Sequence, residues 1–170
     1  YLLGLNWYEQ IIDEEKDLQT IILAKKNFQY VFKNYPNTGY ALDSEFKIGL
    51  IDDILASKEM YIGRYYFDRK KWIPAINRFR NVIDEYETTI YTEEALHRLV
   101  ETYYMLGLED EAKKYANLLG YNYQSSEWYK KSYLVFNKNY KENKIKLIKK
   151  DKDNKKSFLK KFKSLMNLDE

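Results

Sequence analysis

The sequence contains no cysteine, six glycines and two prolines among its 170 residues. Without cysteine the chain forms no disulfide, uses no thiol in catalysis and builds no cysteine-rich zinc site. So few glycines and prolines argue against a sandwich or barrel with many tight turns. The sequence also has no apolar run of about 18 residues, so it predicts no membrane-spanning segment. These absences leave a helical protein as the favoured class.

Charge divides the chain into two parts. The formal net charge is +3, but residues 137–170 carry twelve lysines and five acidic residues, which leaves residues 1–136 at −4. Hydrophobic residues make up 45% of the chain, which is enough for one domain with a sizeable core. We therefore predict a folded domain over residues 1–136 and a lysine-rich tail over residues 137–170.

Apolar residues recur at spacings of three and four along most of the chain, which predicts helices. The expected ranges are 1–12, 17–34, 38–68, 71–87, 92–106, 109–119 and 125–136. The expected apolar face of the long helix over 38–68 consists of Phe46, Leu50, Ile54, Met60 and Tyr61. Gly107 and Gly120 are predicted to end the helices before them, and Ser125 or Ser126 to cap the last one.

A repeated pattern links the second helices of successive pairs. Its copies are Ala24, Phe28 and Val31; Ala75, Phe79 and Val82; and Ala112, Ala116 and Leu119. The last two alanines of the pattern are 37 residues apart, close to the period of about 34 in tetratricopeptide repeats. Gly63 and Tyr66 hold the small and aromatic positions expected in the helix before Ala75. The pattern predicts an all-α protein, an α-solenoid of tetratricopeptide-like helix pairs with about three and a half repeats; the alternative is an ordinary helical bundle.

Several motifs mark the junctions between these repeats. They are the Tyr35-Pro-Asn-Thr-Gly-Tyr-Ala stretch, the Ala56 to Lys70 segment, Ala75-x2-Arg78 with Asp84 to Thr88, Glu94-Ala-Leu with Tyr103-Tyr-x-Leu-Gly, and Asn122-Tyr-Gln-Ser-Ser-Glu-Trp-Tyr. In these motifs the chain resembles the BamD family, also called YfiO or ComL, over residues 1–136. Glu87 and Gln124 stand where the family has prolines, which weakens the turns but keeps the register.

The resemblance implies a non-catalytic lipoprotein of the outer-membrane β-barrel assembly machine, at the periplasmic face of the outer membrane. The implied partners are the barrel-forming subunit, through its periplasmic domains, other assembly lipoproteins and unfolded outer-membrane proteins. The family's lipidated cysteine and first repeat do not occur in this sequence, and no cofactor, metal or nucleic acid is implied. The alternatives are a generic periplasmic repeat adaptor, for example in cell-wall coordination, and an accessory domain of a larger enzyme.

The first helix of each pair is expected to line the binding surface of the solenoid. The expected lining residues are Met60, Arg64, Phe67, Glu94, His97, Glu101 and Tyr104, and the expected docking end holds Arg98, Tyr103, Tyr104 and Trp128. His97 and Glu101 could form an acid–base couple, but a polar pair in the binding surface is the favoured interpretation. Phe67 and Tyr104 could instead only pack between repeats.

The tail contains a second amphipathic pattern. Its apolar residues are Phe158, Leu159, Phe162, Leu165 and Met166, and lysines surround them. This pattern predicts a basic amphipathic helix, for which three uses remain open. It could cap the last repeat or contact a partner, it could bind anionic lipid, or, with less support, it could bind nucleic acid.

Overall fold

The computed structural model of the chain describes residues 1–11 and 18–136, and this part of the chain consists of helices and their connections. The helices are α1 (Leu2–Glu9), α2 (Leu18–Asn34), α3 (Gly39–Asp68), α4 (Trp72–Glu85), α5 (Thr92–Met105), α6 (Glu109–Asn122) and α7 (Glu127–Val135). Contacts divide the chain into a unit Tyr1–Ser132 and a unit Tyr133–Glu170. The predicted tail helix lies outside the described residues, and the predicted domain boundary at residue 136 stays a prediction.

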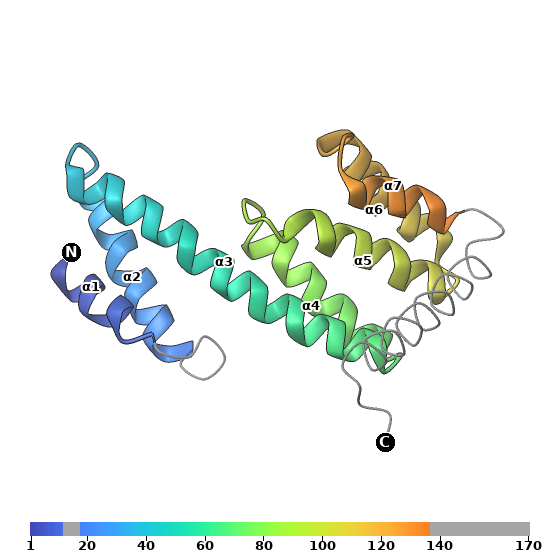
Figure 1. Cartoon of the computed structure of the whole chain (residues 1–170), viewed down its shortest axis with the longest axis horizontal. Coiled ribbons are helices and arrows are strands. Elements are labelled where there is room, and N and C mark those ends of the chain that lie inside the picture. The colour runs from blue at the N-terminus through green and yellow to red at the C-terminus, as the bar shows by residue number, and fades with distance from the viewer. Residues whose placement is uncertain (12–17, 137–170) are drawn as a thin grey trace, which may run out of the picture. The chain divides into compact units, whose positions relative to one another are not determined.

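Each helix from α1 to α5 packs against the next one along the chain. Figure 1 shows α1 and α2 beside the first half of α3, with α4 and α5 beside its second half. This sequential packing of antiparallel helices confirms the predicted all-α solenoid of tetratricopeptide-like helix pairs. α3 is 30 residues long, about twice the length of α4 and α5 with 14 residues each, so it takes part in two packing units.

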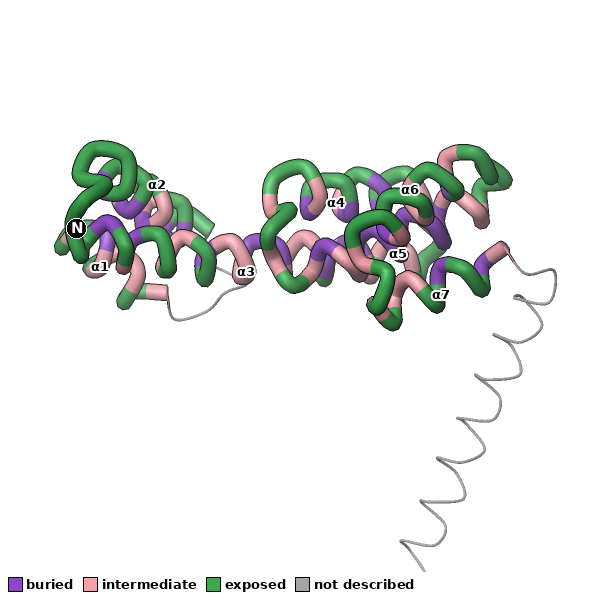
Figure 2. Tube along the Cα trace, turned by 90° about the horizontal axis from the view of Figure 1, so that it is seen from above, coloured by how far each residue is buried: buried purple, intermediate pink, exposed green. Residues whose placement is uncertain are grey.

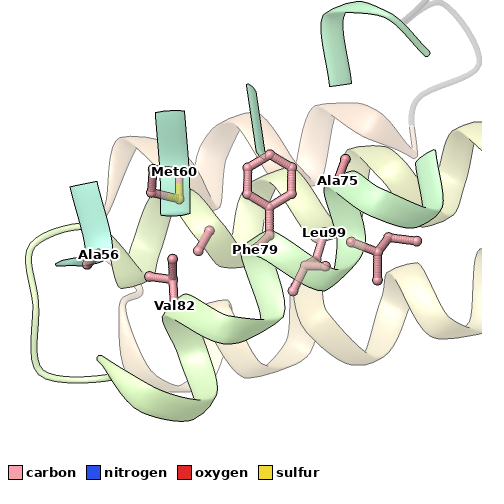
Figure 3. Packing of buried hydrophobic residues seen from close by; sticks show 8 residues of the cluster. Ala56, Met60, Ala75, Phe79, Val82 and Leu99 are labelled. Carbon is pink, nitrogen blue, oxygen red and sulfur yellow. The ribbon is translucent and has the colours of Figure 1, made fainter. Parts of the chain in front are cut away.

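The two packing units have separate cores. The first core holds Ile21, Ala24, Phe28, Ile51 and Leu55, from α2 and the first half of α3. The second core joins α3, α4 and α5 through Ala56, Met60, Ala75, Ile76, Phe79, Val82, Ala95 and Leu99. Figure 3 shows Phe79 of α4 among these side chains. Tyr86, which follows α4, packs against both cores and therefore connects them.

Two of the three helix ends predicted from glycine or serine follow from their local sequence. Gly107 ends α5 as predicted, because its φ of +79° is a left-handed conformation that glycine adopts without steric cost. The Ser126 hydroxyl accepts a hydrogen bond of 3.1 Å from the Trp128 amide, which confirms Ser126 as the cap of α7. The prediction for Gly120 is wrong, since α6 continues to Asn122. Gly120 instead makes room for a ring, because a Cβ there would lie 2.7 Å from Cε2 of Tyr129.

The predicted apolar face of α3 is also wrong in part. Phe46 and Tyr61 are 66% and 61% exposed, whereas Ile51 is fully buried. Figure 2 shows buried and exposed residues alternating along α3. The reason is that the helices packed on its first half lie on the side of Ile51 and Leu55, opposite Phe46. The face expected for α2 is confirmed, since Ala24, Phe28 and Val31 are all buried.

Two glycines of α3 provide a matched pair for testing the packing of α3 on α4. A Cβ at Gly63 would lie 2.5 Å from Cε1 of the buried Phe79, while a Cβ at Gly49 would meet no atom within 4 Å. We expect Gly49→Ala to stabilise the fold by about 0.5–1 kcal/mol, because alanine favours the helix. Gly63→Ala should destabilise it by about 1–2 kcal/mol, because overpacking outweighs that gain. Urea denaturation measures the free energy of unfolding of both variants. Equal stabilisation by the two would contradict the close approach of Phe79 to Gly63.

Candidate protein-binding surface

Alternate helices of the chain, α3, α5 and α7, bring polar and aromatic side chains together. We call this the A-helix surface, formed by Arg64, Phe67, Glu94, Arg98 and Trp128. The Arg64 guanidinium donates two hydrogen bonds to the Glu94 carboxylate, from Nε at 2.9 Å and from Nη2 at 2.6 Å. Such bidentate pairs are geometrically specific as well as strong. This pair therefore fixes α3 against α5 in one orientation.

Glu94 has a shifted pKa. Burial by itself would raise the pKa of the Glu94 carboxyl, but the hydrogen bonds and charge of Arg64, with those of Arg98, outweigh it and hold the pKa below its usual range. The pKa of Arg64 is raised, chiefly by its hydrogen bond to Glu94. Both groups are therefore charged at neutral pH, and the A-helix surface presents fixed charges of both signs.

Arg98 connects all three helices of the A-helix surface. Its Nη1 donates a hydrogen bond of 2.7 Å to the Glu101 carboxylate, and its Nε donates one of 3.4 Å to Glu94. The guanidinium carbon lies 5.5 Å from the ring centre of Phe67 on α3 and 5.9 Å from that of Trp128 on α7. These distances permit cation–π attraction to both rings. With 24% of its side chain exposed, Arg98 also remains accessible to a partner.

Three of the predicted lining residues lie beneath this surface rather than on it. Met60 is fully buried in the second core, and His97 and Glu101 are 3% and 2% exposed. This corrects their predicted role, because Met60 packs in the core against α4 and because α7 lies over the side of α5 that carries His97. The imidazole Nδ1 of His97 is 2.8 Å from the Ser132 hydroxyl oxygen, Nε2 is 3.5 Å from the Glu101 carboxylate, and the ring lies 5.3 Å from that of Trp128. The His97–Glu101 pair thus joins α5 to α7.

The two tyrosines predicted at the docking end are both partly buried. The Tyr103 ring stacks on Tyr115 of α6, with ring centres 5.5 Å apart and planes 8° apart. Burial, and then the neighbouring Tyr103, raise the pKa of Tyr115. Tyr103 therefore lies on the side of α5 that faces α6, away from the A-helix surface. Whether Tyr104 contacts a partner stays a prediction.

Sequence reasoning missed several residues at the junction of α5 and α7. Ser126 donates a hydrogen bond to the Glu93 carboxylate, and the Lys131 ammonium lies 4.0 Å from the centre of the Trp128 ring. Trp128 therefore has Arg98 and Lys131 as cationic neighbours. Small and cationic residues around a tryptophan at the start of a helix are the only sequence signal for this junction, and they do not identify the helix it packs against.

Together these contacts form a surface of alternating charges and aromatic rings. Hydrogen bonds and ion pairs between its side chains hold it in place. Aromatic and arginine side chains carry much of the binding energy in protein interfaces. Residues 1–11 and 18–136 contain no cluster of acidic or histidine side chains able to hold a metal ion. In the same described ranges, no helix has the length and apolar character needed to cross a membrane. The charges and aromatic rings of the A-helix surface suit the binding of a protein segment.

Comparison with known proteins gives the chain a family. The family YfiO, described as "Outer membrane lipoprotein", matches residues 1–119. The outer membrane protein assembly factor BamD of Rickettsia prowazekii (strain Madrid E) is 52% identical over 140 residues, which are 82% of this chain and 55% of that protein. The protein of the same name from Caulobacter vibrioides is 42% identical over 139 residues, 82% of this chain and 46% of that protein. The chain spans about half the length of these relatives, and it belongs to the YfiO (BamD) family of outer membrane lipoproteins.

Proposed function

We propose that this chain is a non-catalytic scaffold of outer-membrane β-barrel protein assembly, acting at the periplasmic face of the outer membrane. It docks the periplasmic domains of the barrel-forming subunit, contacts other assembly lipoproteins, and helps deliver unfolded barrel proteins. The names of the relatives support the role in assembly. The docking role is supported above all by the A-helix surface. Hydrogen bonds fix the orientation of its arginines, and its partly exposed side chains are Arg64, Phe67, Arg98 and Trp128.

The geometry supports a docking role more than a chemical one. The only histidine, His97, is buried between α5 and α7, where its ring contacts Ser132 and Trp128. A surface that is already organised loses little conformational entropy when a partner binds, so more of its contact energy becomes affinity. The ion pairs bracing Arg64 and Arg98 supply that organisation.

The experiment is an affinity measurement by calorimetry between the whole chain and the periplasmic domains of the barrel-forming subunit. We expect Trp128→Ala to weaken binding at least about tenfold, because aromatic anchors near arginine are typical hot spots. Arg64→Ala should weaken it several-fold. Tyr30→Ala is the matched control, since Tyr30 is 61% exposed on α2, outside the A-helix surface. Unchanged affinity for Trp128→Ala and Arg64→Ala, with circular dichroism showing intact folds, would reject the proposed docking site.

A further inference from the structure

The first half of α3 carries an apolar stripe on the side away from the core. Leu42, Phe46 and Leu50 are 72%, 66% and 36% exposed. They are spaced by four residues, which places them on one face of the helix over about 12 Å. Isolated exposed apolar residues are ordinary, but three in register form a continuous surface, and such surfaces mark interaction sites.

The stripe remains exposed because of where the neighbouring helices pack. α1 reaches α3 through a hydrogen bond of 2.5 Å from the Tyr1 hydroxyl to Asp43. α2 reaches it through the ion pair of Lys25 and Asp52, with 2.5 Å between Nζ and Oδ1. α4 packs against the second half of α3, through the core that starts at Ala56. In a repeat of ordinary length the next helix would cover a face like this one, but α3 continues for 30 residues before its partner helix begins.

Two of the acidic residues beside the stripe have no cationic partner among the described residues. Asp43 has Lys47 as an ion-pair partner at 3.4 Å, and Asp52 has Lys25. Glu45 and Asp53, by contrast, make no side-chain hydrogen bond or ion pair to any residue in the described part of the chain. Their separation of eight residues corresponds to about 12 Å along the helix, the same length as the stripe. An apolar stripe with an unpaired acid near each end favours a cationic, apolar ligand.

We propose that Leu42, Phe46 and Leu50 form a second docking site, separate from the A-helix surface, for an amphipathic helix of a partner protein that carries lysine or arginine beside its apolar stripe. Helix-on-helix recognition of this kind uses apolar anchors at spacings of three and four. A second copy of this chain fits poorly, because pairing two such faces would bring the carboxylates of Glu45 and Asp53 from both copies together. An anionic membrane surface is disfavoured by the same two carboxylates.

The test measures fluorescence anisotropy of a labelled 16-residue helical peptide with a leucine stripe flanked by lysines, titrated with the whole chain. Its twin peptide has glutamate in place of every lysine. We expect the lysine peptide to bind at least about tenfold more tightly than its twin, and Phe46→Ser to weaken its binding about tenfold. The double variant Glu45→Gln and Asp53→Asn should weaken it several-fold at low salt and have little effect at high salt.

Controls separate this site from non-specific binding and from self-association. Ile73→Ser removes an apolar residue of α4 that is 61% exposed, and it should leave the affinity for the lysine peptide unchanged. Equal affinity for the two peptides, or an equal loss with Ile73→Ser and Phe46→Ser, would overturn the proposal. So would a dimer in sedimentation equilibrium that Phe46→Ser dissociates, since the stripe would then bind a second copy.

Discussion

Replacing Phe79 with alanine is expected to destabilise the chain by about 3–5 kcal/mol, which is a large part of the stability of a domain of this size. Phe79 is fully buried in the core that joins α3, α4 and α5. Its ring fills the space beside Gly63, where a Cβ would come within 2.5 Å of it. Truncation removes the apolar contacts and leaves a cavity that the helices can close only in part.

Phe46→Ala is the matched control for this prediction, because the same chemical change is made on the same solenoid at an exposed position. Phe46 is 66% exposed, so its truncation should change stability by no more than about 0.5 kcal/mol. Urea denaturation followed by circular dichroism gives both free energies of unfolding. If Phe79→Ala lowered the free energy of unfolding no more than Phe46→Ala, the core between α3 and α4 would not be a main source of stability.

The second large effect is expected from Arg98→Met, which should cost about 2–4 kcal/mol. Glu101 is 2% exposed, and Arg98 supplies a cationic partner at 2.7 Å from its carboxylate. Removing that cation leaves a buried negative charge much less compensated, and methionine replaces only the apolar contacts to Phe67 and Trp128. The loss should therefore exceed that expected from any surface arginine of this chain.

A double variant and a surface variant identify the cause of this loss. Adding Glu101→Leu to Arg98→Met removes the buried charge together with its partner, and we expect it to recover at least half of the lost stability. Arg80→Met serves as the surface control, because Arg80 is 53% exposed and lies 4.0 Å from Asp84, so the expected change is below about 1 kcal/mol. Thermal and urea unfolding provide the measurements. Equal losses for Arg98→Met and Arg80→Met would contradict the account of the buried charge.

Much of the fold could be predicted because local rules decide it. The periodicity of α2, the left-handed glycine that ends α5 and the serine that caps α7 all depend on residues close in sequence. The repeated alanine and phenylalanine also placed Ala75 and Phe79 correctly in the core, and Gly63 beside them. These features are contained in single helices or in adjacent pairs, so a single sequence is sufficient.

The errors concern faces whose neighbours come from distant parts of the chain. Periodicity shows that α3 has apolar positions, but it does not show that α1 and α2 pack opposite Phe46. In the same way, the repeat register placed His97 and Glu101 on the binding surface, and only the contacts of α7 with α5 show that they are buried. Gly120 was misjudged because its role is contact with Tyr129 and not a turn.

The most direct test of the central claim, that this chain is a scaffold of barrel protein assembly, replaces the matching segment of the Caulobacter vibrioides relative with this chain. The chimera is expressed in cells depleted of their own assembly factor, and folded barrel proteins in the outer membrane are quantified. A chimera with the same junctions and the corresponding Rickettsia prowazekii segment serves as the control. We predict folded barrel protein at levels equal to the control for this chain, and a clear loss when it carries Trp128→Ala. The account would be contradicted if the control chimera restored normal levels of folded barrel protein while the chimera with this chain left them as low as in the depleted cells.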